Sequence, residues 1–242
     1  MIVGTADVSA RPYLAIGRET LMTGTGMDEE AVVEAMTLPV AVERPRIRRE
    51  LARKAFHVAS ASLPLLVWLA PRWVALAVLL PMAAVAVAVD WTRLRYRAPR
   101  YWFLRYTRRM LRHHERRRFA GATYMAVAYA VAVVVFPKPI AVMAMLFNGF
   151  GDAAAALVGK RFGRHRTAWG KSWEGFAAGL AVNLAVGLTI SSLAPALLPA
   201  PAAAAGALAA AVLEFLDLPI DDNVRVTLGG GGVAFLVAML LG

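Results

Sequence analysis

Long apolar runs separated by short basic segments make up most of the chain after residue 55. The runs are continuous rather than amphipathic, and hydrophobic residues occupy 59% of the 242 positions, which argues against a soluble core. A helix needs about 20 apolar residues to cross a bilayer. The pattern predicts an all-α, multi-pass transmembrane bundle of about seven spans. The expected spans are residues 55–70, 73–90, 121–136, 139–158, 175–194, 203–218 and 224–242.

The segment before the first span has a different composition. Residues 1–43 are rich in acids and glycine and contain only two basic residues, Arg11 and Arg18. We interpret them as a polar, acidic N-terminal tail, compatible with partial disorder. Residues 44–242 are expected to form one membrane-embedded domain, because the spans and their short loops use almost all of this length.

Basic residues are concentrated in alternate loops. Residues 44–54 contain six, residues 91–120 contain eleven arginines and residues 159–171 contain five, whereas the loops of opposite parity contain only Arg72 and Lys138. Lys and Arg are retained on the cytoplasmic side of membrane proteins. The count therefore predicts that the N-terminus and the basic loops are cytoplasmic.

The formal net charge of +11 is explained by anionic lipid headgroups, and no nucleic-acid partner is needed to account for it. In the largest basic segment, Arg93–Arg118, we expect the arginines to bind lipid headgroups, and RRMLRHHERRRF at residues 108–119 is typical of an amphipathic helix at the membrane interface. The sequence makes no prediction about oligomeric state.

Asp152 is an acid placed between apolar segments, where an ionisable residue is costly and usually functional. The competing interpretation is a hydrogen bond between helices, with Asn148 or Asn183 as its partner. Asp152 is thus the first candidate for a catalytic or metal-binding residue.

A glycine-rich basic segment follows Asp152. It is not a Walker A loop, because His165 stands where the first glycine before Gly170-Lys171-Ser172 would be required. Glycines and cations still favour phosphate binding, although a short connector would contain the same residues. The candidate residues are Gly159, Gly163, Gly170, Lys160, Arg161, Arg164, Arg166 and Lys171.

Acids are rare after residue 100, and six of the seven lie near expected cytoplasmic ends of spans. Mg²⁺ binds one or two carboxylates together with substrate phosphates. The combination predicts a Mg-nucleotide site, with Asp152, Asp221 and Asp222 as candidate metal ligands. For Lys171 and Glu174 the alternative is a salt-bridged turn at the start of the fifth span.

These residues resemble the CTP-dependent polyprenol kinases, a family that includes dolichol kinase, phytol kinase and the CTP-using diacylglycerol kinase. The nucleotide-binding pattern of that family is matched by Asp152, Ala155, Gly159, Gly163, Arg166, Lys171, Ser172, Glu174 and Gly175. Further similarities are Arg53-Lys54 and His57 before the first span, GATYM at residues 121–125, and Asp222-Asn223 before the last span. The resemblance covers residues 48–242.

The resemblance implies a lipid kinase domain that transfers the γ-phosphoryl group of CTP to a membrane lipid alcohol, with Mg²⁺ as cofactor. Asp152, Lys171 and Asp222 would be catalytic. Nucleotide binding would involve Gly159, Lys160, Arg161, Gly163, Arg166, Lys171, Ser172, Glu174 and Gly175. Arg53, Lys54, His57, Asn148 and Asn223 would orient the acceptor or the phosphates. Polyprenol, phytol and diacylglycerol all remain possible acceptors.

Two other functions are compatible with parts of the sequence. A CDP-diacylglycerol synthase also uses CTP, but its typical His-Gly-Gly and Asp-Arg-x-Asp motifs do not occur in residues 217–231, DLPIDDNVRVTLGGG. A membrane transporter would use Asp152 at a broken helix to couple ions. Against the transporter, the polar groups gather at one expected face of the membrane rather than at its midplane.

Overall fold

The computed structural model describes residues 62–107, 115 and 117–242. The chain divides into two units after residue 45, and all described residues belong to the second, residues 46–242. The acidic tail at residues 1–43 and the predicted site residues Arg53, Lys54 and His57 lie outside the described residues.

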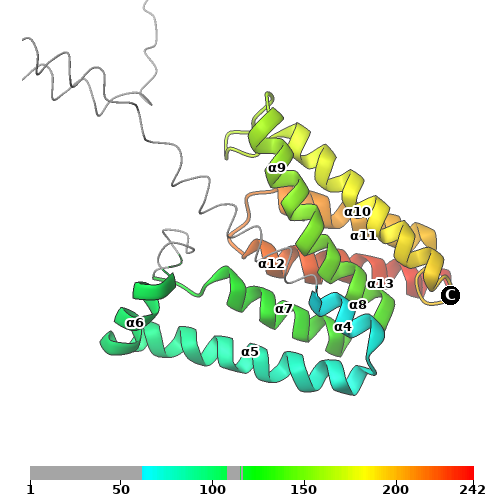
Figure 1. Ribbon diagram of the computed structural model, residues 1–242. Helices are drawn as coiled ribbons and strands as arrows, with labels where there is room; N and C mark the ends of the chain where they lie inside the picture. Colours follow the sequence, from blue (N-terminus) through cyan, green and yellow to red (C-terminus); the bar gives the residue numbers. More distant parts are fainter. Residues whose placement is uncertain (1–61, 108–114, 116) are drawn as a thin grey trace, which may run out of the picture. The chain divides into compact units, whose positions relative to one another are not determined.

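All regular secondary-structure elements of the described residues are helices (Figure 1). One isolated antiparallel bridge joins Arg166 to Ser172. The α-helices are α4 (Ser62–Leu69), α5 (Arg72–Arg95), α6 (Arg97–Thr107), α7 (Gly121–Val135), α8 (Lys138–Leu146), α9 (Asp152–Phe162), α10 (Trp173–Leu193), α11 (Ala200–Phe215), α12 (Asp222–Val224) and α13 (Gly230–Leu241). Two π-helical segments connect α-helices without a break in the chain direction: η3 (Phe147–Gly151) joins α8 to α9, and η4 (Arg225–Gly229) joins α12 to α13.

Among the described residues, four continuous helical stretches are long and apolar enough to cross a membrane: Arg72–Arg95, Lys138–Phe162, Trp173–Leu193 and Asp222–Leu241. The predicted all-helical membrane architecture is confirmed at this level. Helices α7 and α11 have 15 and 16 residues and are apolar but shorter. At about 1.5 Å per residue such helices extend only some 23 Å. The count of seven spans therefore remains a prediction.

Small residues allow the helices to approach closely, as is common in membrane bundles. A Cβ added at Gly206 of α11 would lie 2.8 Å from the Cβ of Ala234 in α13, and one added at Gly230 would lie 2.8 Å from the Cβ of Ala210. Larger side chains fill the centre of the second unit, where Tyr129 and Phe147 are fully buried. The helix termini that carry polar residues are thereby held in fixed positions.

At one end of the bundle, two cations form hydrogen bonds in opposite directions between the α4–α5 pair and the α7–α8 pair. Arg72, at the start of α5, donates through Nη2 to the carbonyl of Val134 near the end of α7. Lys138, at the start of α8, donates to the carbonyls of Trp68 and Ala70 at the end of α4, at 3.2 and 2.8 Å. These carbonyls belong to helix C-termini, which carry partial negative charge and lack partners within the helix.

The amphipathic helix predicted at residues 108–119 falls largely outside the described part of the chain, so it remains a prediction. Helix α5 continues to Arg95, so Arg93 is buried, with 1% exposure, and its guanidinium forms an ion pair with Asp90. Arg93 therefore does not share in the expected binding of lipid headgroups, because its charge is compensated inside the protein. Helix α6 is amphipathic and has no buried residue. Residues 108–114 and 116 lie outside the described residues.

Candidate functional site

A polar pocket lies where α9, α10, α11 and α12 meet the loop between α9 and α10. Three cations and three carboxylates share its wall. The polar and charged lining residues are Asp152, Lys160, Arg166, Lys171, Ser172, Glu214 and Asp222, and the remaining lining residues are Ala155, Ala156, Gly159, Gly170, Gly175, Phe176 and Phe215. The pocket thus brings together segments that are separated by up to 70 positions along the chain.

Lys171 forms an ion pair with Glu214, with 2.6 Å between Nζ and Oε1, and it also donates to the backbone carbonyl of Glu214. Its predicted alternative partner, Glu174, accepts instead from the backbone N–H of His165 at 3.1 Å and lies 2.8 Å from the ring Nδ1 of His165. The salt-bridged turn between Lys171 and Glu174 is therefore absent. Sequence reasoning did not single out Glu214, because its partner is 43 positions away.

Side chains from the loop between α9 and α10 and from η4 satisfy the last carbonyls of α11. Besides Lys171 at Glu214, Trp169 donates from Nε1 to the carbonyl of Phe215 at 2.9 Å, and Arg225 donates to that of Leu216 at 2.7 Å. These acceptors lie at the negative end of the helix dipole, where donors and cations are favourable. The end of α11 therefore fixes Lys171 and the basic loop against the pocket.

The loop between α9 and α10 is held by its own arginine. Arg166 donates to the carbonyl of Gly159 at 2.8 Å and to that of Gly170 at 3.1 Å. Gly170 has φ of +87°, a left-handed conformation that favours glycine. The guanidinium of Arg166 lines the pocket while its hydrogen bonds brace the loop.

The other glycines of this segment serve helix packing. A Cβ at Gly163 would lie 2.7 Å from Oγ of Ser172, which precedes α10, and one at Gly175 would lie 2.6 Å from the carbonyl oxygen of Ala155 in α9. Ser172 caps α10 by accepting from the N–H of Gly175 at 3.1 Å. The need for glycine here is close approach of α9 to α10, a reason that differs from the expected access of backbone N–H groups to an anion.

Asp152 is the first residue of α9 and directly follows the π segment η3. No described residue forms a hydrogen bond or an ion pair with its carboxylate. Asn148 donates instead to Asn223 at 3.1 Å, so the proposed helix-to-helix bond between Asp152 and Asn148 is absent. The carboxylate faces the pocket and is available to a ligand.

The neighbouring acids Asp221 and Asp222 have different positions. Asp221 caps α12 and accepts from the backbone N–H and the side-chain amide of Asn223, at 3.0 and 2.8 Å. Asp222 lines the pocket and accepts from Arg225 through Oδ1. Of the three predicted metal ligands, the pocket therefore contains Asp152 and Asp222.

Asn183 lies on α10 beside a narrow crevice that continues from the pocket past Asp152. It is 2% exposed, and its Oδ1 has no hydrogen-bond partner among the described residues. It does not bond to Asp152, so the second helix-to-helix alternative is also absent. A buried amide oxygen without a hydrogen-bond donor costs free energy, which makes Asn183 notable within α10.

The donor set fits a Mg²⁺ ion that arrives with a polyphosphate. Within the described part of the chain, no group of three or more His, Cys, Asp or Glu side chains is arranged to hold a metal by itself. Mg²⁺ commonly takes only one or two carboxylates and completes its shell with phosphate oxygens and water. Asp152 and Asp222 on one pocket wall meet that requirement.

Several predicted residues lie beside the pocket rather than in its wall: Arg161, Gly163, Glu174, Asn148, Asn223 and Asp221. Arg161 is exposed at the end of α9, with its guanidinium carbon 5.6 Å from the ring centroid of Phe162. The others act on the packing or capping of the pocket-forming helices.

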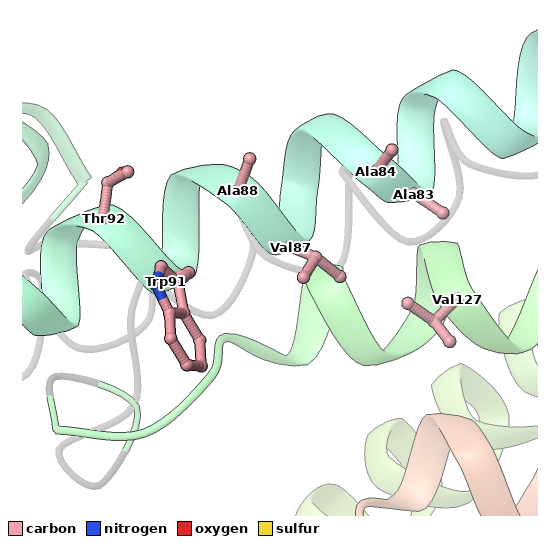
Figure 2. A pocket seen from close by; sticks show the side chains of 7 residues that line it. All are labelled: Ala83, Ala84, Val87, Ala88, Trp91, Thr92 and Val127. Atoms are coloured by element: carbon pink, nitrogen blue, oxygen red, sulfur yellow. The ribbon is translucent and has the colours of Figure 1, made fainter.

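A second hollow has no comparable chemistry. Figure 2 shows an open groove along α5, closed on one side by Val127 of α7. Its lining contains alanines, valines, Trp91 and Thr92, without a charged residue. Such a surface suits lipid chains and does not offer the donors that a phosphate needs.

Comparison with known proteins gives one match, and it covers the segments that form the pocket. The model of the family described as Cytidylyltransferase family matches residues 47–219, which include α4 to α11 and most of the pocket. Neither the curated proteins nor the solved structures contain a significant match.

Proposed function

The chain belongs to the cytidylyltransferase family and is a membrane enzyme of lipid metabolism that uses CTP; we propose that it transfers the γ-phosphoryl group of CTP to the hydroxyl of a membrane lipid alcohol. The products would be a lipid monophosphate and CDP. Family membership favours an enzyme over the transporter considered above.

The observation that carries the proposal is the composition of the polar pocket. Three cations and three carboxylates share one wall, and no described side chain engages Asp152. Phosphoryl transfer needs positioning and neutralisation of spread negative charge rather than covalent work by the protein. Cations for the phosphates and carboxylates for the ion and the proton are the parts that this chemistry requires.

Each side chain has a role in the proposed reaction. Lys160, Arg166 and Lys171 would bind the phosphates, and the contact of Lys171 with Glu214 would loosen as the nucleotide enters. The alcohol oxygen attacks the γ-phosphorus, the bond to the CDP oxygen breaks, and Asp152 accepts the hydroxyl proton.

Asp222 would hold Mg²⁺, because Arg225 engages its Oδ1 and leaves Oδ2 for the ion. The bound ion would neutralise charge on the phosphates. The sequence-based assignment of Asp152 as a metal ligand remains the alternative to its role as proton acceptor.

The membrane location suits the acceptor. Each CH₂ group of a prenyl or acyl tail contributes about 0.8 kcal/mol to staying in the bilayer. Only the hydroxyl must then reach the pocket. Polyprenol, phytol and diacylglycerol all present such a hydroxyl. The proposed reaction also requires that the pocket opens to the cytoplasm, where CTP is available.

The second candidate is cytidylyl transfer to phosphatidate, which the family description favours. In that reaction the acceptor phosphate attacks the α-phosphorus of CTP and pyrophosphate leaves. The absence of His-Gly-Gly and Asp-Arg-x-Asp from residues 217–231 supports the kinase instead.

Labelled CTP separates the two reactions. The purified full-length protein is incubated in lipid nanodiscs with CTP labelled at the α or the γ position and with a panel of lipid alcohols and phosphatidate. We expect γ label in the lipid and CDP as by-product, with little transfer from ATP. Label from the α position in the lipid, together with pyrophosphate, would identify the cytidylyltransferase and contradict the kinase.

A further inference from the structure

Helix α6 carries a surface of cations and aromatic rings. It contains three arginines, Arg97, Arg100 and Arg105, and no acid. Tyr101, Trp102 and Tyr106 are between 54% and 73% exposed. Arg105 donates to the hydroxyl of Tyr101 at 3.2 Å and lies over the ring of Trp102, which stacks on Tyr106. Basic and aromatic side chains beside a membrane-spanning helix match an anionic, amphipathic bilayer surface.

The inner side of α6 rests on a buried ion pair. The guanidinium carbon of Arg93 lies 4.5 Å from the ring centroid of Phe103 in α6. Arg93 and its partner Asp90 are each 1% exposed. A change in the position of α6 therefore alters the contact between Phe103 and Arg93.

The same ion pair fixes the segment that leads into α7. Arg93 donates to the carbonyls of Glu115 and Arg118, at 3.1 and 2.8 Å. Asp90 accepts from the backbone N–H of Ala120 at 2.7 Å. Breaking any of these bonds would leave a polar group unsatisfied, so the segment follows Arg93 and Asp90.

That segment contacts the polar pocket through Asn223. Glu115 accepts from the N–H of Gly121 at 3.0 Å, and Asn223 donates to the carbonyl of Gly121 at 3.2 Å. The space is tight, since a Cβ at Gly121 would lie 3.0 Å from Oε1 of Glu115 and 3.3 Å from Nδ2 of Asn223. Asn223 directly follows Asp222, which lines the pocket.

We propose that α6 binds anionic phospholipids of the surrounding bilayer and that this binding raises turnover by fixing Asn223 and Asp222. Headgroups draw the arginine face of α6 toward the membrane, and Phe103 transmits its position to Arg93. The lipid-binding step is independent of the reaction, whereas the effect on turnover rests on the proposed function. The lipid acts as an effector at a site distinct from the pocket.

Lipid binding is tested with a single label, because the chain contains no cysteine. The variant Tyr106→Cys carries a nitroxide in nanodiscs of phosphatidylcholine, with or without phosphatidylglycerol. We expect phosphatidylglycerol to reduce access of an aqueous relaxing agent to the label, and high salt to reverse the effect. Adding Arg100→Gln and Arg105→Gln should abolish the response, while Arg117→Gln, outside α6, should preserve it. If phosphatidylglycerol leaves the access of the relaxing agent to the label unchanged, the proposal is wrong.

Coupling is tested with a second label at Ile220→Cys, an exposed position close to Asp222. Phosphatidylglycerol should reduce the mobility of this label and raise kcat about fivefold, the lower end of typical allosteric couplings. Phe103→Leu should keep the response of the Tyr106→Cys label but remove both the mobility change and the gain in kcat. If Phe103→Leu leaves the coupled responses intact, the proposed route is wrong. If both labels respond but no alcohol is phosphorylated, the kinase assignment fails and the lipid coupling stands.

Discussion

The side-chain amide of Asn148 donates a 3.1 Å hydrogen bond to Oδ1 of Asn223, which lies 75 positions further along the chain. Asn148 belongs to the π segment η3. Asn223 belongs to α12, and a single residue separates it from the start of η4. Single π turns inside helices often occur at functional sites. The bond ties the helical stretch that carries Asp152 to the one that carries Asp222, so one amide pair sets the spacing of two pocket carboxylates.

Asn148→Ala should therefore lower both stability and turnover. It leaves Oδ1 of Asn223 without this donor in a buried place, at a cost of about 1–3 kcal/mol. Thermal unfolding in detergent and kcat are measured for both single alanine variants and for the double variant with Asn223→Ala. A coupling energy near zero in this cycle would show that the bond contributes nothing.

Asp152→Asn tests the charge of the unengaged carboxylate. The amide keeps the volume, and no described hydrogen bond is lost. Turnover should fall by a factor on the order of 10² or more, whether the charge binds Mg²⁺ or accepts the proton. Expression should be unchanged or improved, since a costly charge is removed from the bundle. Full activity in the folded variant would exclude Asp152 from the chemistry.

Lys171 and Glu214 should behave as a pair. Lys171→Met removes a phosphate-binding cation and leaves the partly buried carboxylate of Glu214 without its partner. We expect a higher KM for CTP and a loss of about 1–3 kcal/mol in stability. Adding Glu214→Gln should restore much of the stability but not the KM. Recovery of CTP affinity in the double variant would mean that Lys171 serves only to neutralise Glu214.

Gly151→Ala should disturb the contact between η3 and α10. A Cβ at Gly151 would lie 2.0 Å from Oδ1 of Asn183, a distance that no packing tolerates. The variant should lose thermal stability, and adding Asn183→Ala should restore part of it. Gly232→Ala is the matched control, because a Cβ there meets nothing within 4 Å. Equal melting temperatures for Gly151→Ala and Gly232→Ala would contradict this packing.

Seven spans would place the two termini on opposite sides of the membrane. Reporters fused before Met1 and after Gly242 should therefore indicate different compartments, with the N-terminal one in the cytoplasm. The basic loops supply the physical reason. Reports from the same compartment would mean that one of the seven expected spans does not cross, and the spans outside the four long apolar helices would be the first to examine.

Much of the fold was predictable because membrane helices are recognisable in the sequence as long apolar runs. Asp152, Lys171 and Asp222 stood out as charged groups at the ends of such runs, and the structure places them in one pocket. Their convergence depends only on which helix ends share a face. This information is present in the order of spans and loops.

Other features depend on tertiary contacts that composition does not encode. Glu214 resembles any acid at a span end until Lys171 is found beside it. No local pattern marks the π segments, and the partner of Asn148 in η3 is an asparagine 75 positions away. The glycines at 159, 163 and 175 suit a phosphate loop, and only the distances to neighbouring atoms reveal that they also let α9 and α10 approach closely.

The reciprocal contacts of Arg72 and Lys138 impose an order on biosynthesis. The carbonyl that Arg72 binds is made 62 residues after Arg72 itself, whereas the acceptors of Lys138 already exist when Lys138 leaves the ribosome. During insertion Arg72 therefore has no carbonyl of α7 to bind until Val134 is made, and we expect the two helix pairs to associate only after that point. Truncation before Val134 should leave the nascent chain sensitive to membrane quality control, and extension past Lys138 should relieve it.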